Sequence, residues 1–558
     1  MPGTNFDTGL DDQSALVAAS RSFTVGDLLT KAARSHPDRV AVCEPGTEWT
    51  YAELDERVNR LANALVAAGV EPNESTIAVL AENRSELVEL LFVGAKLGCL
   101  VAACNWRLDR DELVHCVDTV DPEFLFVSER FTDRVEWLAN DADATPAVVG
   151  LDGDERETAG SGEGGEDERF DHDYDAMLAS GDPERPHVDG GVDPEQGYAV
   201  IYTSGTTGLP KAAVVSHRAE FARATQVVLD YGLEQGDSYP AWAPMFHMAG
   251  IDWTVVTAIL GGTFYPIDGF DPERIVEVLR TADSPLSWLI LVPGVVDALV
   301  KYIESEGLGP ADFQQIRAVG ALLDLIDPEH VGRITAFLGA PAQNTYGATE
   351  VGHAASAAQL APGTPATDDV LSKRESPLVD CKIVDESGES VPTGTPGEML
   401  VRGPSLFSGY VGNPEATAAD FDDGWFHTGD VLVRNEDGSY DFVNRVKYLV
   451  KSGGENIYPV ELERVLVEHE TVVDAVVVRV PDEKWGEVPR AVVGVRDQLA
   501  VSREELLDLL RDRVANYKLP HYVELVDPAS LPRSSTGKIV RPDVEDWPVS
   551  DEDRVRSR

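Results

Sequence analysis

Ten consecutive residues, Tyr202–Lys211, have the composition of a phosphate-binding loop. They hold four threonine or serine hydroxyls, two glycines and a lysine. Glycines let the backbone approach a ligand, N–H groups and hydroxyls donate to phosphoryl oxygens, and lysine adds a positive charge. The spacing differs from the P-loop pattern Gly-x-x-x-x-Gly-Lys-Ser/Thr. A surface turn rich in glycine and serine would explain the glycines, but not four hydroxyls that end in Pro-Lys.

Two predicted strands, at 199–202 and 212–215, position this loop, because apolar residues run into it and out of it. Ser216 can cap a following helix that reaches Leu229. Upstream, helical and strand patterns alternate, with a predicted helix at 24–33 capped by Thr24, another helix at 51–68 and a strand at 77–80. The alternation continues to about residue 340 and predicts a layered α/β fold.

Two stretches depart from this alternation. Residues 151–191 contain a Gly/Asp/Glu run and are predicted to be a flexible, mainly solvating surface excursion. From Lys447 onward the pattern changes to mixed elements, predicted as a helix at 459–468, a strand at 472–480, a helix after Ser502 and a strand at 522–526. These residues are numerous enough to form a small separate domain.

Length and charge indicate the number of domains, the partners that are not expected and the salt environment. The chain has 558 residues, more than one core usually holds, so at least two domains are expected. Its 98 acidic and 46 basic residues give a formal charge of −52, which disfavours nucleic acid and anionic membranes as partners. Such a surface suits concentrated salt, so we expect a salt-adapted cytosol, as in a halophilic microbe. A stability optimum below about 0.2 M salt would refute this.

Cysteine usage and hydropathy predict a cytoplasmic protein. The five cysteines have no Cys-x-x-Cys spacing and are expected to be reduced core residues. No basic-then-apolar leader opens the chain, so secretion is not expected. The longest apolar stretch, 87–104, contains Glu89 and Lys96 and favours a buried helix over a membrane span. No integral membrane association is therefore expected, and the oligomeric state is left open.

The loop resembles the phosphate loop of the adenylate-forming enzymes, a family that includes acyl-CoA synthetases, nonribosomal-peptide adenylation domains and luciferases. Five further motifs of that family follow in the family's order and extend the resemblance over nearly the whole chain. They are Pro244–Gly250, Asn344–Glu350, Gly424–Asp430, Arg445–Lys447 through Glu463, and Pro532–Lys538. The resemblance implies an α/β fold with a large amino-terminal domain of several subdomains, residues 1–445, and a small mobile α+β carboxy-terminal domain, residues 446–558.

The resemblance also implies a reaction with ATP, Mg²⁺ and coenzyme A. A carboxylate attacks the α-phosphorus of ATP to form an acyl adenylate, pyrophosphate leaves, and a thiol then displaces AMP. The implied phosphate, metal and adenosine contacts in the larger domain are Thr203, Ser204, Gly205, Thr206, Thr207, Gly208, Lys211, Gly320, Tyr346, Gly347, Thr349 and Glu350. Among them, Glu350 and Thr203 are the implied magnesium ligands.

The remaining implied contacts lie later in the chain. Asp430 matches an acid that accepts both ribose hydroxyls, and Arg445 matches a second ribose or phosphate contact. Lys538 matches a lysine that bridges the substrate carboxylate and the α-phosphate, although a lysine in such a loop is ordinarily a solvated charge. The implied hinge and thiol face comprise Lys447, Lys451, Gly453 and Gly454.

His247 occupies the position where the family's acyl pocket meets the thiol tunnel. An imidazole there carries no fixed negative charge, so the substrate is not expected to be an amino acid. The implied pocket walls are mostly apolar or aromatic and favour medium-chain, branched or aryl acids; they are His247, Met248, Trp253, Gly320 and Tyr346–Ala348. Three segments depart from the family pattern without removing a group that the chemistry requires: Asn444, Tyr448 and Val319–Leu322.

The sequence thus predicts a carboxylate–CoA ligase that forms acyl-AMP. One alternative is an enzyme that adenylates an acid and loads it onto the phosphopantetheine of a carrier protein. No carrier domain follows Arg558, which favours CoA without deciding the question. A second alternative is a nonenzymatic nucleotide sensor, against which the joint presence of Glu350, Asp430 and Lys538 argues.

Overall fold

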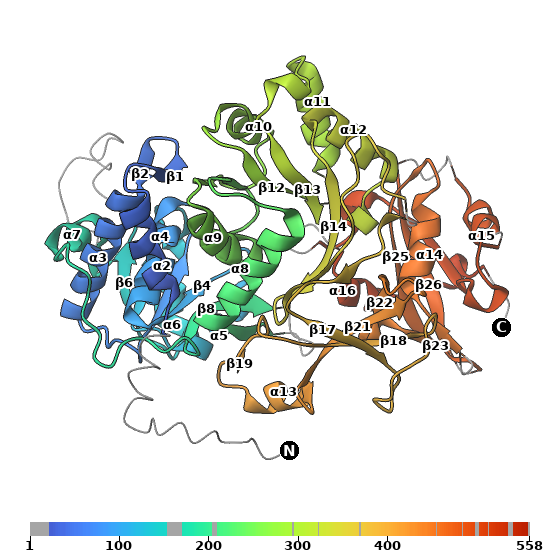
Figure 1. The fold of residues 1–558 in the computed structure, drawn as a ribbon. Coiled ribbons are helices and arrows are strands. Elements are labelled where there is room, and N and C mark those ends of the chain that lie inside the picture. The colour runs from blue at the N-terminus through green and yellow to red at the C-terminus, as the bar shows by residue number, and fades with distance from the viewer. Residues whose placement is uncertain are drawn as a thin grey trace, which may run out of the picture. The chain divides into compact units, whose positions relative to one another are not determined.

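The computed structural model describes the chain in segments, namely 22–152, 170–203, 209–292, 295–321, 323–367, 370–452, 455–482, 484–496, 501–511, 513–533 and 539–555. These residues form two compact units. The first runs to Leu371 and includes 375–379 and 403–419; the second holds 372–374, 380–402 and the chain from Asp420 onward. Figure 1 labels the helices and strands of both units. The predicted domain boundary between 445 and 446 stays a prediction.

The first unit contains an eight-stranded sheet. In order, its strands are β19 (Gly409–Tyr410), β9 (Lys211–Ser216), β8 (Gly197–Thr203), β4 (Leu100–Ala103), β3 (Thr76–Leu80), β5 (Phe124–Val127), β6 (Ala147–Gly150) and β7 (His172–Asp173). The strands from β8 to β7 pair in parallel, whereas β9 runs antiparallel to both β8 and β19. The phosphate loop therefore lies at an antiparallel end of a largely parallel sheet.

Two smaller sheets complete the strands of this unit. One is ordered β10 (Tyr239–Ala241), β11 (Phe264–Pro266), β1 (Val40–Glu44) and β2 (Thr47–Thr50). The other contains β12 (Leu286–Leu291), β13 (Ile316–Ala321), β14 (Ala342–Ala348) and β15 (Gly352–Ser356). In the second of these, β12, β13 and β14 are parallel and β15 turns back antiparallel to β14. That turn carries Thr349 and Glu350, the last two residues of the predicted motif Asn344–Glu350.

Helices connect and cover these sheets (Figure 1). They are α2 (Val25–Ser35), α3 (Tyr51–Ala67), α4 (Ser85–Leu97), α5 (Arg110–Val120), α6 (Thr132–Asp141), α7 (Tyr174–Ser180), α8 (His217–Tyr231), α9 (Met248–Leu260), α10 (Pro272–Thr281), α11 (Val296–Ser305), α12 (Pro328–Leu338) and α13 (Pro414–Ala419). Helix α2 begins where Thr24 and Asp27 form a reciprocal capping box. Helix α8 begins at Ser216, whose hydroxyl accepts a hydrogen bond from the Ala219 N–H. Both predicted caps are confirmed.

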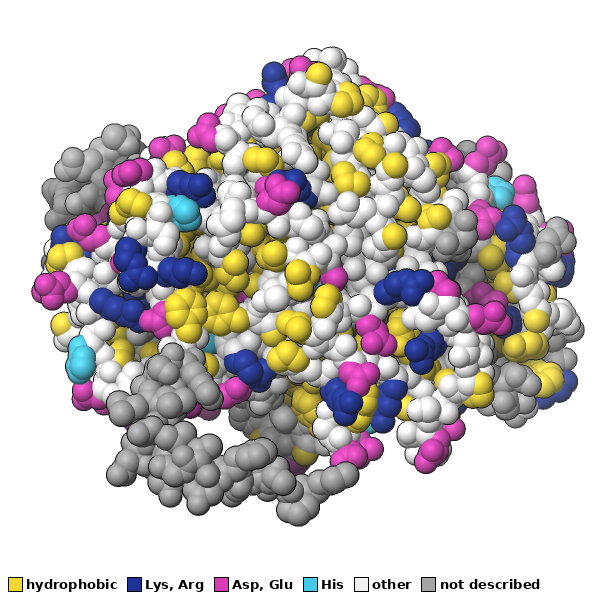
Figure 2. All heavy atoms as spheres, viewed as in Figure 1, with side chains coloured by type: hydrophobic (Ala, Val, Ile, Leu, Met, Phe, Trp, Pro, Cys, Tyr) yellow, Lys and Arg dark blue, Asp and Glu magenta, His cyan; other side chains and the backbone are white. Residues whose placement is uncertain are grey.

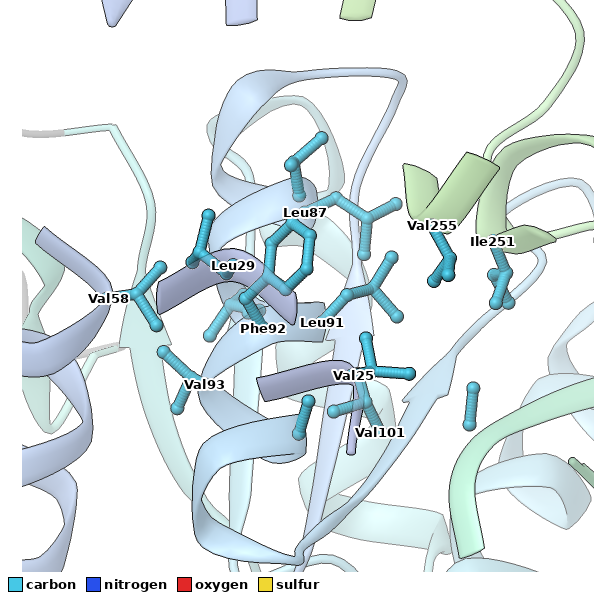
Figure 3. Close-up of a cluster of buried hydrophobic side chains, with 14 of the residues drawn as sticks. Val25, Leu29, Val58, Leu87, Leu91, Phe92, Val93, Val101, Ile251 and Val255 are labelled. Carbon is cyan, nitrogen blue, oxygen red and sulfur yellow. The ribbon is translucent and has the colours of Figure 1, made fainter. Parts of the chain in front are cut away.

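Helix α4 lies at the centre of the largest hydrophobic cluster. Figure 3 shows its Leu87, Leu91 and Phe92 between side chains of α2, α3, β4 and α9. Burial of each such side chain contributes about 1.5–3 kcal/mol. Its buried charged residues Glu89 and Lys96 are paired, Glu89 with Arg57 at 3.0 Å and Lys96 with Asp55 at 2.6 Å. The predicted buried helix is confirmed up to Leu97, but the apolar stretch then turns at Gly98 and continues as strand β4.

The predicted acidic excursion is shorter than 151–191. Residues 153–169 lie outside the described part of the chain, whereas 170–191 include β7 and α7. Tyr174, Met177 and Leu178 of α7 are buried, and the Tyr174 hydroxyl donates to Glu89 at 3.0 Å. This part of the prediction was wrong because three apolar side chains on one face of a short helix outweigh the polar residues around it.

The second unit contains two further sheets. One is antiparallel, with β17 (Asp380–Val384), β18 (Pro396–Arg402), β21 (Trp425–Arg434), β20 (Phe421–Asp422) and β22 (Tyr440–Arg445). The other has the order β24 (Glu455–Ile457), β23 (Val450–Ser452), β26 (Gly486–Val495) and β25 (Val472–Asp482), with β27 (Tyr522–Val526) parallel to β26. Helices α14 (Pro459–Val467), α15 (Arg503–Arg511) and α16 (Arg541–Glu545) accompany this second sheet.

The elements predicted late in the chain match this unit closely, and the α/β fold class is confirmed. Figure 2 shows acidic side chains spread over the visible face, with arginine and lysine side chains between them. Among the residues that the structure describes, no helix has both the length and the apolar character needed to cross a bilayer.

Candidate functional site

The phosphate loop is held at its two ends by paired strands. Strand β8 ends at Thr203 and β9 begins at Lys211, and these two residues are the last pair in the antiparallel register. The predicted loop between two strands is confirmed. Its central residues Ser204, Gly205, Thr206, Thr207 and Gly208 lie outside the described residues. The paired strands therefore place Thr203 and Lys211 opposite each other where the loop leaves the sheet.

Tyr410 links the lysine of this hairpin to the predicted metal-binding carboxylate. Strand β19 pairs with β9, with Tyr410 opposite Ala213. The Lys211 Nζ lies 4.3 Å from the centroid of the Tyr410 ring, a cation–π distance. The Tyr410 hydroxyl donates to Glu350 Oε1 at 2.9 Å. A cation, a phenol and a carboxylate from three separate chain segments therefore meet beside the phosphate loop.

Buried Arg223 supports the backbone that carries Glu350. Its Nη2 donates to the Thr349 carbonyl at 2.7 Å and its Nε donates to the Ser405 carbonyl at 2.9 Å. The Phe407 N–H in turn donates to the Glu350 carbonyl at 2.8 Å. The Arg223 guanidinium and one backbone hydrogen bond thus join the segments 349–352 and 405–410.

Gly352 allows Arg223 to approach this closely. Its φ is +71°, in the left-handed region that favours glycine. A Cβ at this position would lie 2.7 Å from Arg223 Cγ and 3.0 Å from Arg223 Nε. A side chain at residue 352 would therefore displace the guanidinium from the two carbonyls it contacts.

Two buried acids accompany Arg223. Asp252 Oδ1 lies 3.7 Å from Arg223 Nη1, within ion-pair distance but longer than a hydrogen bond. Burial raises the pKa of Asp252 and raises that of Glu220 well above its ordinary value, while the charge of Arg223 acts against both shifts. Neither carboxylate oxygen of Glu220 has a hydrogen-bond partner among the described residues. Burial therefore favours the neutral form of Glu220, while Asp252 lies within ion-pair distance of the arginine.

The predicted acyl-pocket residues lie on α9 and on neighbouring strands. His247 directly precedes α9, and its ring centroid lies 4.6 Å from that of Phe246. Trp253 is 3% exposed and stacks on Tyr239 at 4.6 Å and on Trp288 at 5.2 Å, so one face of any pocket here would be an aromatic stack. The role of these residues as pocket walls stays a prediction.

Gly320 and Gly347, both predicted nucleotide contacts, are places where strands come close together. Gly320 lies in β13 with a φ of +143°, and a Cβ there would be 2.3 Å from the Gln343 carbonyl oxygen of β14. A Cβ at Gly347 would be 2.3 Å from the Gly352 carbonyl oxygen. Tyr346, which precedes Gly347 in the chain, is buried, at 7% exposure. The strand geometry alone therefore requires both glycines.

The second unit brings Asp430 and Arg445 together. They are opposite each other in the register of β21 and β22, and Arg445 Nε lies 3.0 Å from Asp430 Oδ1. The aspartate side chain is 3% exposed and the arginine side chain is 47% exposed. A carboxylate can accept hydroxyl hydrogen bonds and an arginine can contact an anion, and the predicted ribose and phosphate roles of this pair stay predictions.

The predicted hinge residues follow this pair. Lys447 lies in a 3₁₀ turn, Val446–Tyr448, and its Nζ is 5.0 Å from the Tyr448 ring. The guanidinium of Arg541 also contacts Tyr448, with its Cζ 4.9 Å from the centroid of the ring. Lys451 Nζ pairs with Glu386 at 3.0 Å on the surface. Gly453, Gly454 and Lys538 lie outside the described residues, so their predicted roles stay predictions.

Sequence reasoning did not single out Arg223, Glu220, Asp252 or Tyr410. A signal for the first two was present, because Glu220 and Arg223 occupy the same face of a predicted helix as Ala219 and Ala222, where apolar residues are expected. No comparable pattern marks Tyr410, which reaches Glu350 only through the pairing of β19 with β9.

Comparisons with known proteins agree with this arrangement. The family model described as AMP-binding enzyme matches residues 29–411, and that described as AMP-binding enzyme C-terminal domain matches residues 461–538. A feruloyl-CoA synthase of an Amycolatopsis species is 32% identical over 94% of this chain and 99% of its own. A fatty acid–acyl-carrier-protein ligase, ScoC of Streptomyces coeruleorubidus, is 32% identical over 92% of this chain and 94% of its own.

A solved structure shows the same fold. The crystal structure of ATP-bound MatB from Rhodopseudomonas palustris has a TM-score of 0.77 and 25% sequence identity, covering 94% of this chain and 99% of that one. Two family models that together span most of the chain, and full-length relatives above 30% identity, are sufficient to assign the family. The chain belongs to the AMP-binding enzyme family, in its acyl-CoA ligase branch.

Proposed function

We propose that this protein is an ATP-dependent carboxylate–CoA ligase. The observation that carries the proposal is the Lys211–Tyr410–Glu350 contact beside the phosphate loop, in a chain of this family. A cation and a carboxylate that both contact one phenol suit a triphosphate together with its metal ion.

In the first half-reaction, a carboxylate oxygen attacks the α-phosphorus of ATP and the bond to pyrophosphate breaks. Thr203 and Lys211 would bind the β- and γ-phosphates, and Thr349, whose carbonyl Arg223 holds, would contact the α-phosphate. Asp430 would accept the ribose hydroxyls with Arg445 beside it. Lys538 would stabilise the charge that develops between the carboxylate and the α-phosphate, a contact worth about 10²–10³ in rate.

Glu350 and Thr203 would hold the magnesium ion, which neutralises phosphate charge when bound. Their hard oxygen atoms fit that ion. Magnesium takes most of its ligands from phosphates and water, so few protein oxygen atoms are needed.

In the second half-reaction, the thiol sulfur of coenzyme A attacks the acyl carbonyl carbon. The bond to AMP breaks and the thiol proton leaves. We propose that the chain turns at Lys447 between the two half-reactions, and that Lys451, Gly453 and Gly454 belong to the face that then admits the pantetheine arm. A Lys447→Pro variant should form acyl-AMP but fail to make the thioester.

The substrate is proposed to be a medium-chain, branched or aryl acid. Aryl acids come first because Trp253 belongs to an aromatic stack and because one relative is named for a feruloyl thioester. A cytoplasmic location and adaptation to high salt remain parts of the proposal. They rest on the burial of most of the cysteines and on the formal charge of −52.

The test is pyrophosphate release in high salt with Mg-ATP, across a panel of acyl and aryl acids, with and without CoA. Release that depends on one acid class and is accelerated by CoA is the expected result. Lys538→Ala should abolish most acyl-AMP formation, and a normal rate in that variant would contradict its role. Absence of release with every acid would support a noncatalytic nucleotide-binding protein.

Transfer to a carrier protein is the second candidate. It is favoured by the likeness to ScoC, a relative named as an acyl-carrier-protein ligase. Acid-dependent pyrophosphate release that CoA does not accelerate, but that a carrier protein bearing phosphopantetheine does, would support it over the CoA ligase.

A further inference from the structure

Helix α5 contacts both ends of the phosphate loop. It packs against β8 and β9, with Cys116 of α5, Tyr202 of β8 and Ala212 of β9 in one hydrophobic cluster (Figure 1). The buried Tyr202 hydroxyl donates to the Cys116 carbonyl at 2.8 Å, just before the loop begins. Where the loop ends, His115 Nε2 lies 3.1 Å from the Pro210 carbonyl oxygen. Two neighbouring residues of one helix therefore hold the two ends of the loop.

The contact between His115 and Pro210 is a hydrogen bond whose direction is fixed by chemistry. A carbonyl oxygen can only accept, so His115 Nε2 carries a proton and donates it. The neutral imidazole protonated at Nε2 and the imidazolium can both do so. On the same helix, the Thr119 hydroxyl donates to the His115 carbonyl at 2.7 Å. The imidazole therefore acts as a donor to the loop in either of these protonation states.

Pro210 needs this donor because it lies where the pairing of β8 with β9 ends. The last pair is Thr203 with Lys211, so Pro210 is one residue beyond it. Pro210 is buried, and a buried carbonyl is costly to leave without a hydrogen bond. Proline has no N–H, so its carbonyl is the backbone group through which a hydrogen bond can hold it. The bond from His115 therefore orients the peptide group that joins Pro210 to Lys211.

We propose that His115 is a positioning residue for Lys211, and through it for the triphosphate of ATP. This rests on the proposed function, in which Lys211 binds the β- and γ-phosphates. The Pro210 carbonyl and the Lys211 nitrogen belong to one planar peptide group, so its orientation sets the direction in which the lysine side chain leaves the backbone. At its other end, Lys211 Nζ lies 4.3 Å from the centroid of the Tyr410 ring. The lysine is thus held at its backbone by α5 and at its ammonium group by β19.

Direct binding tests the proposal without knowledge of the acid. ATP and AMP, each with magnesium, are titrated by calorimetry into the wild-type protein and into a His115→Leu variant. Leucine suits a helix and has no donor. The variant should bind ATP about fivefold more weakly, the effect of one lost hydrogen bond. Its affinity for AMP should be unchanged, because AMP lacks the phosphates that Lys211 is proposed to bind.

Two further variants separate positioning from a general structural role. His115→Gln carries an amide Nε2 that can donate to the Pro210 carbonyl, so it should recover most of the affinity for ATP. His330→Leu is the matched control, because His330 lies in α12 of the same unit, 3.1 Å from Asp297. It should bind both nucleotides like the wild type. Should His115→Leu not fold, His115→Asn replaces it, since its shorter amide does not reach the carbonyl, and the same fivefold loss is expected.

Kinetics give a second readout. In pyrophosphate release, the KM for ATP of His115→Leu should rise about fivefold with little change in kcat, because the phosphate contact is made before and during the reaction.

Several results would overturn the proposal: equal losses of affinity for ATP and AMP, unchanged affinity for ATP, or no recovery in His115→Gln. A fall in kcat at constant KM would overturn it as well. If no acid supports pyrophosphate release, the ligase assignment fails, whereas the titrations of ATP and AMP still decide the role of His115.

Discussion

Arg223 and Arg445 each pair with an aspartate next to a predicted nucleotide contact, but in different surroundings. The Arg223 side chain is 0% exposed and donates to two backbone carbonyls, whereas the Arg445 side chain is 47% exposed. A buried pair repays its desolvation only while both partners and their hydrogen bonds are present. An exposed arginine costs little to lose and is accessible to a ligand. The first arginine therefore supports the site, and the second is placed to take part in binding.

The largest difference between the two arginines should appear in stability. Arg223→Met removes both carbonyl hydrogen bonds and leaves Asp252 buried without its counter-charge, so the free energy of unfolding should fall by about 3–5 kcal/mol. Arg445→Met should change it by less than about 1 kcal/mol. Denaturant unfolding of both variants measures the difference. Similar losses in the two variants would contradict the comparison.

A second comparison, between His217 and His427, concerns the pH dependence of stability. Burial lowers the pKa of His217 to about 4. Below pH 6.5 the unfolded chain takes up a proton that the folded chain does not, so stability should fall as pH drops from 6.5 to 4. The fall attributable to this residue is at most about 1.4 kcal/mol per pH unit.

A His217→Asn variant should show a shallower decline of unfolding free energy over this pH range than the wild type. His427→Asn is the matched control, because His427 is 30% exposed and pairs with Glu398 at the surface of the second unit. A decline as steep as in the wild type would show that His217 is not held neutral.

Asp430→Asn tests the ribose side. Loss of a charged acceptor for two hydroxyls should lower kcat/KM for ATP by about 10- to 100-fold, with most of the effect in binding. Stability should change little compared with the loss in Arg223→Met. An unchanged KM for ATP would remove Asp430 from the proposed nucleotide contacts.

Tyr410→Phe should have the smallest effect. It deletes only the hydrogen bond to Glu350 and keeps the ring beneath Lys211. A bond to a charged acceptor at a partly buried position is worth about 1.5 kcal/mol, so kcat/KM for ATP should fall about tenfold. Magnesium titration of the initial rate is the sharper readout, because a less constrained Glu350 should require more magnesium for half-maximal activity.

Sequence patterns anticipated the elements that local chemistry determines. Capping residues Thr24 and Ser216 mark the starts of α2 and α8, and the apolar runs on each side of the phosphate loop became β8 and β9. Residues such as Lys211, Glu350 and Asp430 were found because they belong to recurring motifs. The contacts of these residues with Tyr410 and Arg223 were not predicted. They depend on pairings between distant segments of the chain, which no local sequence pattern indicates.

The pairing of β19 with β9 also has a consequence for how this protein can be shortened. Residues 403–419 belong to the first unit, although residues 380–402 of the second unit precede them in the chain. They cover the outer edge of β9, whose N–H and C=O groups would otherwise be unpaired next to the phosphate loop. An exposed strand edge invites pairing with another copy of the chain. A fragment ending at Leu371 is therefore expected to aggregate, and a soluble version of the larger unit would need 403–419 joined back to it.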